Sequence, residues 1–123
     1  MGKKRIKTRS AKNKGALFQK EIAKKISELL GIPIKKDGDL ESRQMGMSGT
    51  DIILRGKAKK GFNYSVECKR CESLSIPAWI RQAESNLGDF KNWLLFFRRS
   101  NETAKVVMEA DHFFELLKQI KDK

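Results

Sequence analysis

The sequence contains few of the residues that build disulfide or metal-rich scaffolds, and it has no long apolar run. Its 123 residues include two cysteines, one histidine and two prolines. Two cysteines cannot form a disulfide framework, and nothing implies an oxidising compartment. The longest apolar run, residues 93–97, is far below the ~20 residues that span a bilayer. No apolar segment follows the basic N-terminus, as a secretory signal would require. We therefore expect a cytoplasmic protein without a membrane partner.

Acidic residues are absent from positions 1–20, which makes the charge distribution uneven. The whole chain has 27 Lys and Arg against 15 Asp and Glu, a formal net charge of +12. A charge of this size favours a polyanionic partner, and nucleic acid is the leading candidate. Residues 1–15 have little to bury, so we expect a flexible basic arm there and one domain over 16–123. The alternative is a solubilising tail. In the arm, the candidates for phosphate contacts are Lys3, Lys4, Arg5, Lys7, Arg9, Lys12 and Lys14.

The apolar pattern predicts an α/β protein that begins with an amphipathic helix over 16–30. Phe18, Ile22 and Ile26 recur there at helical spacing, and Gly31 predicts the end of the helix. A strand over 62–69 shows strict alternation, with Val66 and Cys68 on one face and Glu67 and Lys69 on the other.

The remaining elements follow from shorter signals. With them, the expected order is α-β-β-β-α-β-β-α, with a mixed central sheet flanked by helices. They are a weak strand near Ile34, a strand over 50–54, a lysine-rich turn over 56–61, a helix from Ser75 to about Asn86, a hairpin of strands over 93–97 and 104–108, and a last helix capped by Asp111.

The chemistry is predicted to lie with Asp51, Glu67 and Lys69. Asp51 begins one strand and Glu67 lies on the next, so adjacent strands would bring both carboxylates to one end of a sheet. Clustered carboxylates repel each other and call for a cation. Mg²⁺ prefers such oxygen ligands, and Mn²⁺ suits them too. A metal held there can activate water and neutralise charge on a phosphodiester, with a lysine nearby to stabilise the transition state. The alternative is that Glu67 and Lys69 form an ordinary solvated surface pair.

At this point the sequence resembles a known superfamily. Asp51 followed by Glu67-Cys68-Lys69 matches the D-(x)n-ExK signature of the PD-(D/E)xK nucleases, which have a restriction-endonuclease-like core. Lys14-Gly15 with Glu21, and the segment from Arg43 to Asp51, are similar to archaeal-type Holliday junction resolvases and their phage relatives. The resemblance covers residues 14–110. One departure is Thr50, which stands where the superfamily's name has proline.

The resemblance implies a role for each matching residue. Asp51 and Glu67 would be metal ligands together with the main-chain carbonyl of Cys68, and Lys69 would be the catalytic lysine. Glu21 would complete the site from the first helix, directly or through water. Two further roles are implied, for Ser48 in the loop near the scissile phosphate and for Gln82 in orienting the site. Outside the arm, the arginines that are candidates for phosphate contacts are Arg43, Arg70 and Arg81.

Three functions remain open on this evidence. The first is a metal-dependent endonuclease that resolves four-way DNA junctions by paired symmetric nicks, which implies a homodimer. The second is a nuclease of the same fold with another DNA specificity, because fold does not determine function. The third is a basic nucleic-acid-binding protein without catalysis. Cys68 and Cys71 spell C-x-x-C, but they lack the ligands of a zinc site and the context of a redox motif, so we expect Cys68 to pack in the core.

Overall fold

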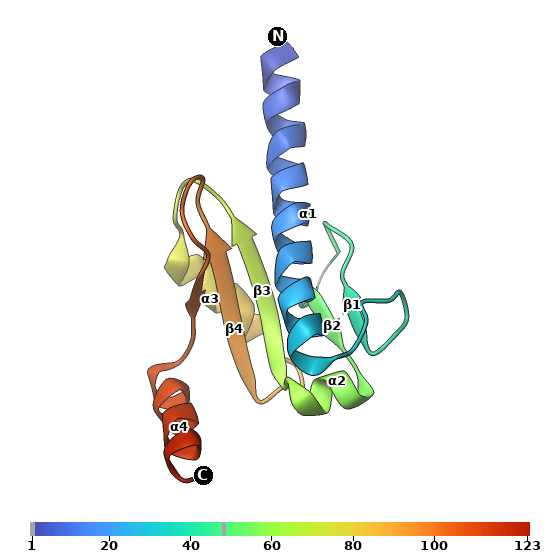
Figure 1. The fold of residues 1–123 in the computed structure, drawn as a ribbon. Helices are drawn as coiled ribbons and strands as arrows, with labels where there is room; N and C mark the ends of the chain where they lie inside the picture. The colour runs from blue at the N-terminus through green and yellow to red at the C-terminus, as the bar shows by residue number, and fades with distance from the viewer. Residues whose placement is uncertain (1, 48) are drawn as a thin grey trace.

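The computed structural model describes residues 2–47 and 49–123, with side chains described from residue 11 onward. A long N-terminal helix crosses a layer of strands, and further helices cover the opposite face and the C-terminal end (Figure 1). The elements are α1 (Gly2–Leu30), β1 (Leu40–Ser42), β2 (Ile52–Leu54), α2 (Gly56–Gly61), β3 (Tyr64–Arg70), α3 (Ile76–Ser85), β4 (Asn92–Arg98), β5 (Lys105–Val107) and α4 (Ala110–Lys121).

The strands form two sheets, an antiparallel β1–β2 pair and a mixed sheet of order β3-β4-β5, whereas the sequence predicted one mixed central sheet. β1 pairs antiparallel with β2, and β3 lies parallel to β4, which pairs antiparallel with β5 as the expected hairpin. The amide of Asp51 donates to the carbonyl of Val66 at 2.8 Å, and this bond joins the β1–β2 pair to β3. Because Asp51 directly precedes β2, the connection sets its side chain against β3.

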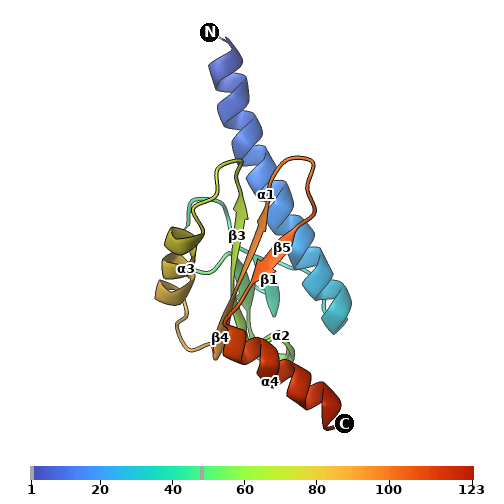
Figure 2. The same cartoon turned by 90° about the vertical axis from the view of Figure 1, so that its left-hand side faces the viewer.

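Both faces of β3 are covered, by α1 on one side and by α3 on the other (Figure 2). Val66 packs with Phe18, Ile22 and Ile26 of α1. The opposite cluster holds Trp79 and Ala83 of α3 with Trp93 and Leu95 of β4, so both tryptophans belong to the core. The alternation predicted for β3 is therefore confirmed. However, the polar face is buried by α3 rather than solvated.

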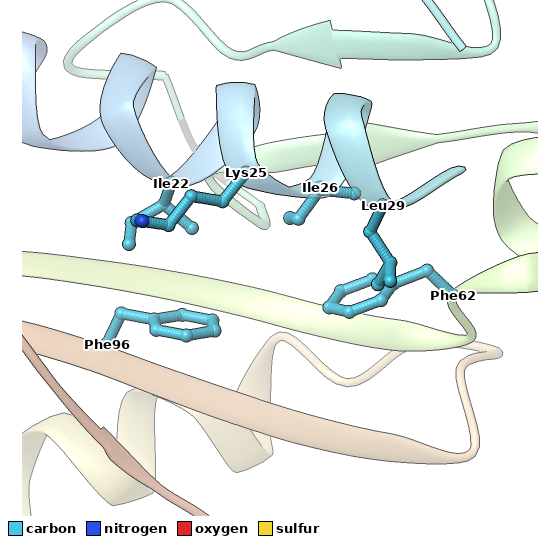
Figure 3. Close-up of a pocket in the computed structure, with 6 residues that line it drawn as sticks. All are labelled: Ile22, Lys25, Ile26, Leu29, Phe62 and Phe96. Carbon is cyan, nitrogen blue, oxygen red and sulfur yellow. The ribbon is translucent and has the colours of Figure 1, made fainter. Parts of the chain in front are cut away.

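An apolar groove marks where α1 meets the strands (Figure 3). The aliphatic stem of Lys25 lies along this groove, as long cationic side chains do when they cover apolar surface. The groove is lined by Ile22, Lys25, Ile26, Leu29, Phe62 and Phe96.

The structure corrects three predictions about the elements. Residues 1–15, expected as a flexible arm, are helical from Gly2 onward, since Lys, Arg and Ala are good helix formers. The expected turn at 56–61 is the short helix α2, whose Ala58 is fully buried. The expected strand near Ile34 is a single bridge to Leu40, and the strand itself is β1, because the fully buried Leu40 pairs with β2.

The last helix begins one residue earlier than the predicted cap, with Glu109 at its N-cap and Asp111 in its first turn. His112 anchors it, since this buried ring hydrogen-bonds the Tyr64 hydroxyl at 2.5 Å. Phe113 and Phe114 lie exposed on its surface. Within residues 2–47 and 49–123, none of the helices has the length and hydropathy that crossing a membrane requires.

Candidate active site

The two predicted acidic residues meet where β2 joins β3. The Asp51 amide bonds the Val66 carbonyl, and the Cys68 amide donates to Asp51 Oδ2 at 2.6 Å. These two bonds hold the Asp51 carboxylate beside the β3 strand that carries Glu67. The sequence predicted that neighbouring strands would bring the two carboxylates together, and the structure does so through main-chain contacts.

Glu67 lies in the middle of β3 and is only 1% exposed, although its side chain is acidic. Asn86, the C-cap residue of α3, donates from Nδ2 to Glu67 Oε1 at 2.6 Å. The Asn86 carbonyl in turn accepts a hydrogen bond from Ser65 Oγ at 3.1 Å. The end of α3 therefore contacts two residues of β3, Ser65 and Glu67. The Asn86 hydrogen bond thus fixes the orientation of the buried Glu67 carboxylate.

Burial dominates the electrostatics of both acids. It raises the pKa of Asp51, while the Cys68 N–H, Lys69 and Arg43 act in the opposite direction. Burial also raises the pKa of Glu67, the Asn86 hydrogen bond lowers it, nearby Asp51 raises it and Lys69 lowers it. The charges of Asp51 and Lys69 thus act on the Glu67 carboxyl in opposite directions. Acids whose pKa is raised by burial and changed by neighbouring charges are common at catalytic sites.

The donor set fits a hard divalent cation. Among the described residues, Asp51 Oδ1 and Glu67 Oε2 make no hydrogen bond, so each carboxylate keeps an oxygen for a ligand. Carboxylate and carbonyl oxygens are the ligands that Mg²⁺ and Mn²⁺ prefer. In the described part of the chain, no group of three or more His, Cys, Asp or Glu side chains is placed to bind a metal. The side-chain ligands available here are thus two carboxylates.

Two side chains, Gln19 of α1 and Arg43, hold the loop that leads into Asp51 by hydrogen bonds to its main-chain carbonyls. Gln19 of α1 donates from Nε2 to the carbonyls of Arg43, at 2.5 Å, and Asp51, at 3.0 Å. Arg43 bonds the Thr50 carbonyl and packs on Gly49, where a Cβ would lie 2.9 Å from Arg43 Nη2. Gly49 also has φ +103°, which side-chain-bearing residues rarely adopt. Arg43, predicted to contact phosphate, holds this loop and lies close enough to lower the pKa of Asp51.

Not every predicted site residue reaches the carboxylates. Glu21 pairs instead with Arg98, Oε1 to Nη1 at 3.2 Å. Gln82 is exposed on α3, and Asn86, one turn later, makes the hydrogen bond to Glu67. Ser48 lies outside the described residues.

The cysteines follow the expectation from the sequence. Cys68 packs against the α1 side of the core, and burial raises its pKa well above the usual value, so the thiol stays protonated. Cys71 is exposed, and both cysteines are free.

The predicted basic residues are distributed over several surfaces. Lys12, Lys14 and Arg81 are exposed, and Arg70 bonds Glu72 and Ser100. The side chains of Lys3, Lys4, Arg5, Lys7 and Arg9 lie outside the described residues.

Sequence reasoning missed two residues that hold the site. Gln19 shares the buried helical face with Ile22 and Ala23, and a polar residue on an apolar stripe is a signal that could have found it. Asn86 was taken only as the end of a helix. A polar residue at the end of a helix does not indicate in the sequence which strand residue its side chain contacts.

A mixed α/β fold that gathers an Asp, a Glu and a Lys at the junction of two strands defines a nuclease of the PD-(D/E)xK type. Residues 10–123 match the family model described as phage putative PDDEXK endonuclease, and the chain belongs to this family. Nucleases of this superfamily generally use Mg²⁺ or a similar divalent metal. The comparisons with curated proteins and with solved structures found no match.

Proposed function

We propose that this nuclease is a structure-selective endonuclease that resolves four-way DNA junctions, with two chains each cutting one strand. The observation that supports nuclease chemistry is the Asp51–Cys68 hydrogen bond. It sets the Asp51 carboxylate beside β3, the strand that carries Glu67 and Lys69. The choice of a junction is supported by the similarity of residues 14–51 to junction resolvases and by the net charge of +12. Two symmetric cuts imply a homodimer with a two-fold axis.

In this proposal Asp51, Glu67 and the Cys68 carbonyl would hold Mg²⁺, which neutralises charge on the phosphate and polarises it for attack by water. Asn86 keeps one Glu67 oxygen occupied, and the Cys68 N–H does the same for Asp51, so both carboxylates keep a fixed orientation. Lys69, two residues after Glu67 on the same strand face, would stabilise the negative charge that develops on the phosphate oxygens. The reaction joins the water oxygen to phosphorus and breaks one P–O ester bond, and a proton from the water ends on the leaving oxygen.

A nuclease with another DNA specificity is favoured by one observation. The resemblance to resolvases gives the first helix an acid at the site, whereas Glu21 here is paired with Arg98. A site with two acidic side chains suits repair, restriction or replication nucleases of this fold as well. The two functions share Asp51, Glu67 and Lys69 and differ only in the DNA they cut.

The test is cleavage of a labelled synthetic four-way junction beside its matched linear duplex, in Mg²⁺ and then in Mn²⁺. We expect paired symmetric nicks in the junction, an intact duplex, and loss of cutting in Glu67→Gln with binding retained. Equal cutting of both substrates would leave the nuclease and overturn the junction specificity. Binding without any cutting by the wild-type chain in either metal would overturn the catalytic assignment.

A further inference from the structure

A pocket of about 260 Å³ lies between α1 and the C-terminal ends of β3 and β4. Three of its lining residues are cations and one is an acid, although the site described above uses none of them. The pocket is lined by Lys14, Leu17, Phe18, Glu21, Arg70 and Arg98. A surface with this excess of positive charge suits an anion.

The pocket is next to the candidate active site but on the other face of β3. Arg70 and Arg98 are paired in the register of β3 and β4, and Arg70 follows Lys69 directly. Because side chains alternate along a strand, Lys69 faces α3 with Glu67, whereas Arg70 faces α1. Lys69 and Arg70 are the last two residues of β3, so the pocket and the Lys69 side chain share the C-terminal end of this strand.

The two arginines are held in place by the loops around them. Arg70 donates to Glu72 at 2.7 Å and to Ser100 at 3.0 Å. Arg98 donates from Nε to the Glu102 carbonyl at 3.0 Å and from Nη1 to Glu21 at 3.2 Å. A guanidinium fixed through Nε still presents its terminal nitrogens to a ligand, so Arg98 is prepared to bind an anion with little rearrangement.

The Glu21–Arg98 ion pair is open to water, with side-chain exposures of 42% and 38%. Ion pairs this exposed contribute little stability, so a competing anion exchanges with the carboxylate easily. Phosphate and carboxylate present similar oxygen pairs to a guanidinium. Glu21 therefore occupies the position that a phosphate would take on Arg98.

The N-terminal half of α1 extends the same surface. In both views it runs beyond the ends of the strands, past the loops that follow β3 and β4 (Figures 1 and 2). Lys12 and Lys14 are exposed on this half, and positions 1–20 contain no acid. A phosphate in the pocket thus lies at the base of a basic helix that can follow a nucleic acid backbone.

We propose that this pocket binds a DNA backbone phosphate through Lys14 and Arg98, and that Glu21 occupies Arg98 in the free protein and gives way when DNA binds. The proposal rests on the proposed nuclease function and adds a second contact to the same substrate. Glu21 thereby acts as an internal competitor of DNA. Removing its charge strengthens binding, whereas removing the charge of Arg98 or Lys14 weakens it.

The test measures binding of a labelled DNA junction by fluorescence anisotropy over a series of KCl concentrations in EDTA, so that no cutting occurs. We expect Arg98→Gln and Lys14→Gln each to raise the Kd about tenfold near 0.1 M salt and to reduce the salt slope by about one. Glu21→Gln should lower the Kd several-fold. Arg55→Gln and Glu41→Gln, which break a comparable exposed ion pair of 3.1 Å elsewhere, are the matched controls and should leave the Kd within about twofold of the wild type.

The expected changes in Kd have opposite signs in Glu21→Gln and Lys14→Gln, so the proposal stays testable if one variant fails to fold. Lys14 is exposed and Glu21 half-exposed, so their variants report even if Arg98→Gln unfolds. Unchanged or weakened binding in Glu21→Gln, or an unchanged slope in Lys14→Gln, would overturn the pocket while wild-type cleavage leaves the nuclease intact. A wild-type chain that neither binds nor cuts DNA would overturn both proposals.

Discussion

Among the described residues, the Glu67 carboxylate has one hydrogen-bond partner, the neutral side chain of Asn86. It is almost completely buried, and Asn86 donates to it from the end of a helix 19 positions later in the chain. A hydrogen bond to a charged group stabilises that group by about 1.5–3 kcal/mol. The Asn86 side chain therefore favours the charged form of Glu67 against the effect of burial.

Replacing Asn86 by Ala should move the acidic limb of the cleavage profile to higher pH. The lost hydrogen bond lowers the pKa of Glu67 in the wild type, so without it the pKa rises further. One pKa unit corresponds to 1.36 kcal/mol, which gives a displacement of roughly one to two pH units. The measurement is the rate of DNA cleavage between pH 5 and 9 in Mg²⁺.

Ser85→Ala provides the control, because Ser85 is the neighbouring exposed residue of α3. Its profile should overlay that of the wild type. A limb that stays in place in Asn86→Ala would show that the Asn86 contact does not set the protonation of Glu67.

At the scale of elements, α1 has two parts with different surroundings. Its C-terminal half packs on β3 through Phe18, Ile22 and Ile26, whereas its N-terminal half extends beyond the strands. Periodicity predicted the packed half because only that half has an apolar stripe. The helical state of residues 2–15 was missed, because a segment without an apolar stripe gives no periodic signal that separates helix from coil.

The packed half of α1 should carry much of the folding stability. Ile26 is 4% exposed against the core, and Ile→Ala changes at such positions cost about 2–5 kcal/mol. We expect Ile26→Ala to lower the free energy of unfolding by that amount. Leu29, on the same helix, is 71% exposed, so Leu29→Ala should change it by less than about 0.5 kcal/mol.

Urea unfolding followed by circular dichroism at 222 nm measures both values. Equal losses in the two variants would contradict the packing of α1 against the sheet, since the residues differ mainly in burial.

At the scale of the whole molecule, the site opposes folding when it carries its charges. Burial raises the pKa of Asp51 and Glu67 in the folded protein, so the folded state binds these protons more tightly than the unfolded state. This contribution to stability is present below the ordinary carboxyl pKa and is lost as the pH rises through the higher folded value. Removing the charge of Asp51 or Glu67 should therefore raise the stability of the folded state most at neutral pH.

We expect Glu67→Gln to raise the Tm by a few degrees at pH 7.5, and the gain to disappear near pH 4, where Glu67 is protonated in both states. About 1 kcal/mol moves the Tm of a domain of this size by roughly 4 °C. Mg²⁺ should raise the Tm of the wild type and not that of Glu67→Gln, because a ligand of the folded state stabilises it. The measurement is a thermal unfolding series in EDTA and in Mg²⁺.

Glu28→Gln is the matched control, since Glu28 is an exposed carboxylate on α1. It should respond to Mg²⁺ as the wild type does. An equal response to Mg²⁺ in Glu67→Gln would place the metal elsewhere, and a gain that persists at pH 4 would not come from the charge of Glu67.

The sequence by itself determined what lies within each element. Alternation over β3 placed Glu67 and Lys69 on one face and Cys68 on the other, and the order of strands brought Asp51 to the same end. These predictions succeeded because the orientation of side chains along one strand is a local property with a period of two.

The tertiary structure alone decided which distant side chains meet. Asn86 rather than Gln82 reaches Glu67, Gln19 closes the loop before Asp51, and Glu21 pairs with Arg98, which is 77 positions later in the chain. No local period specifies such contacts, because they depend on how far each helix slides and rotates on the sheet when the apolar faces pack. The same packing covered the polar face of β3, and so buried and oriented the Glu67 carboxylate.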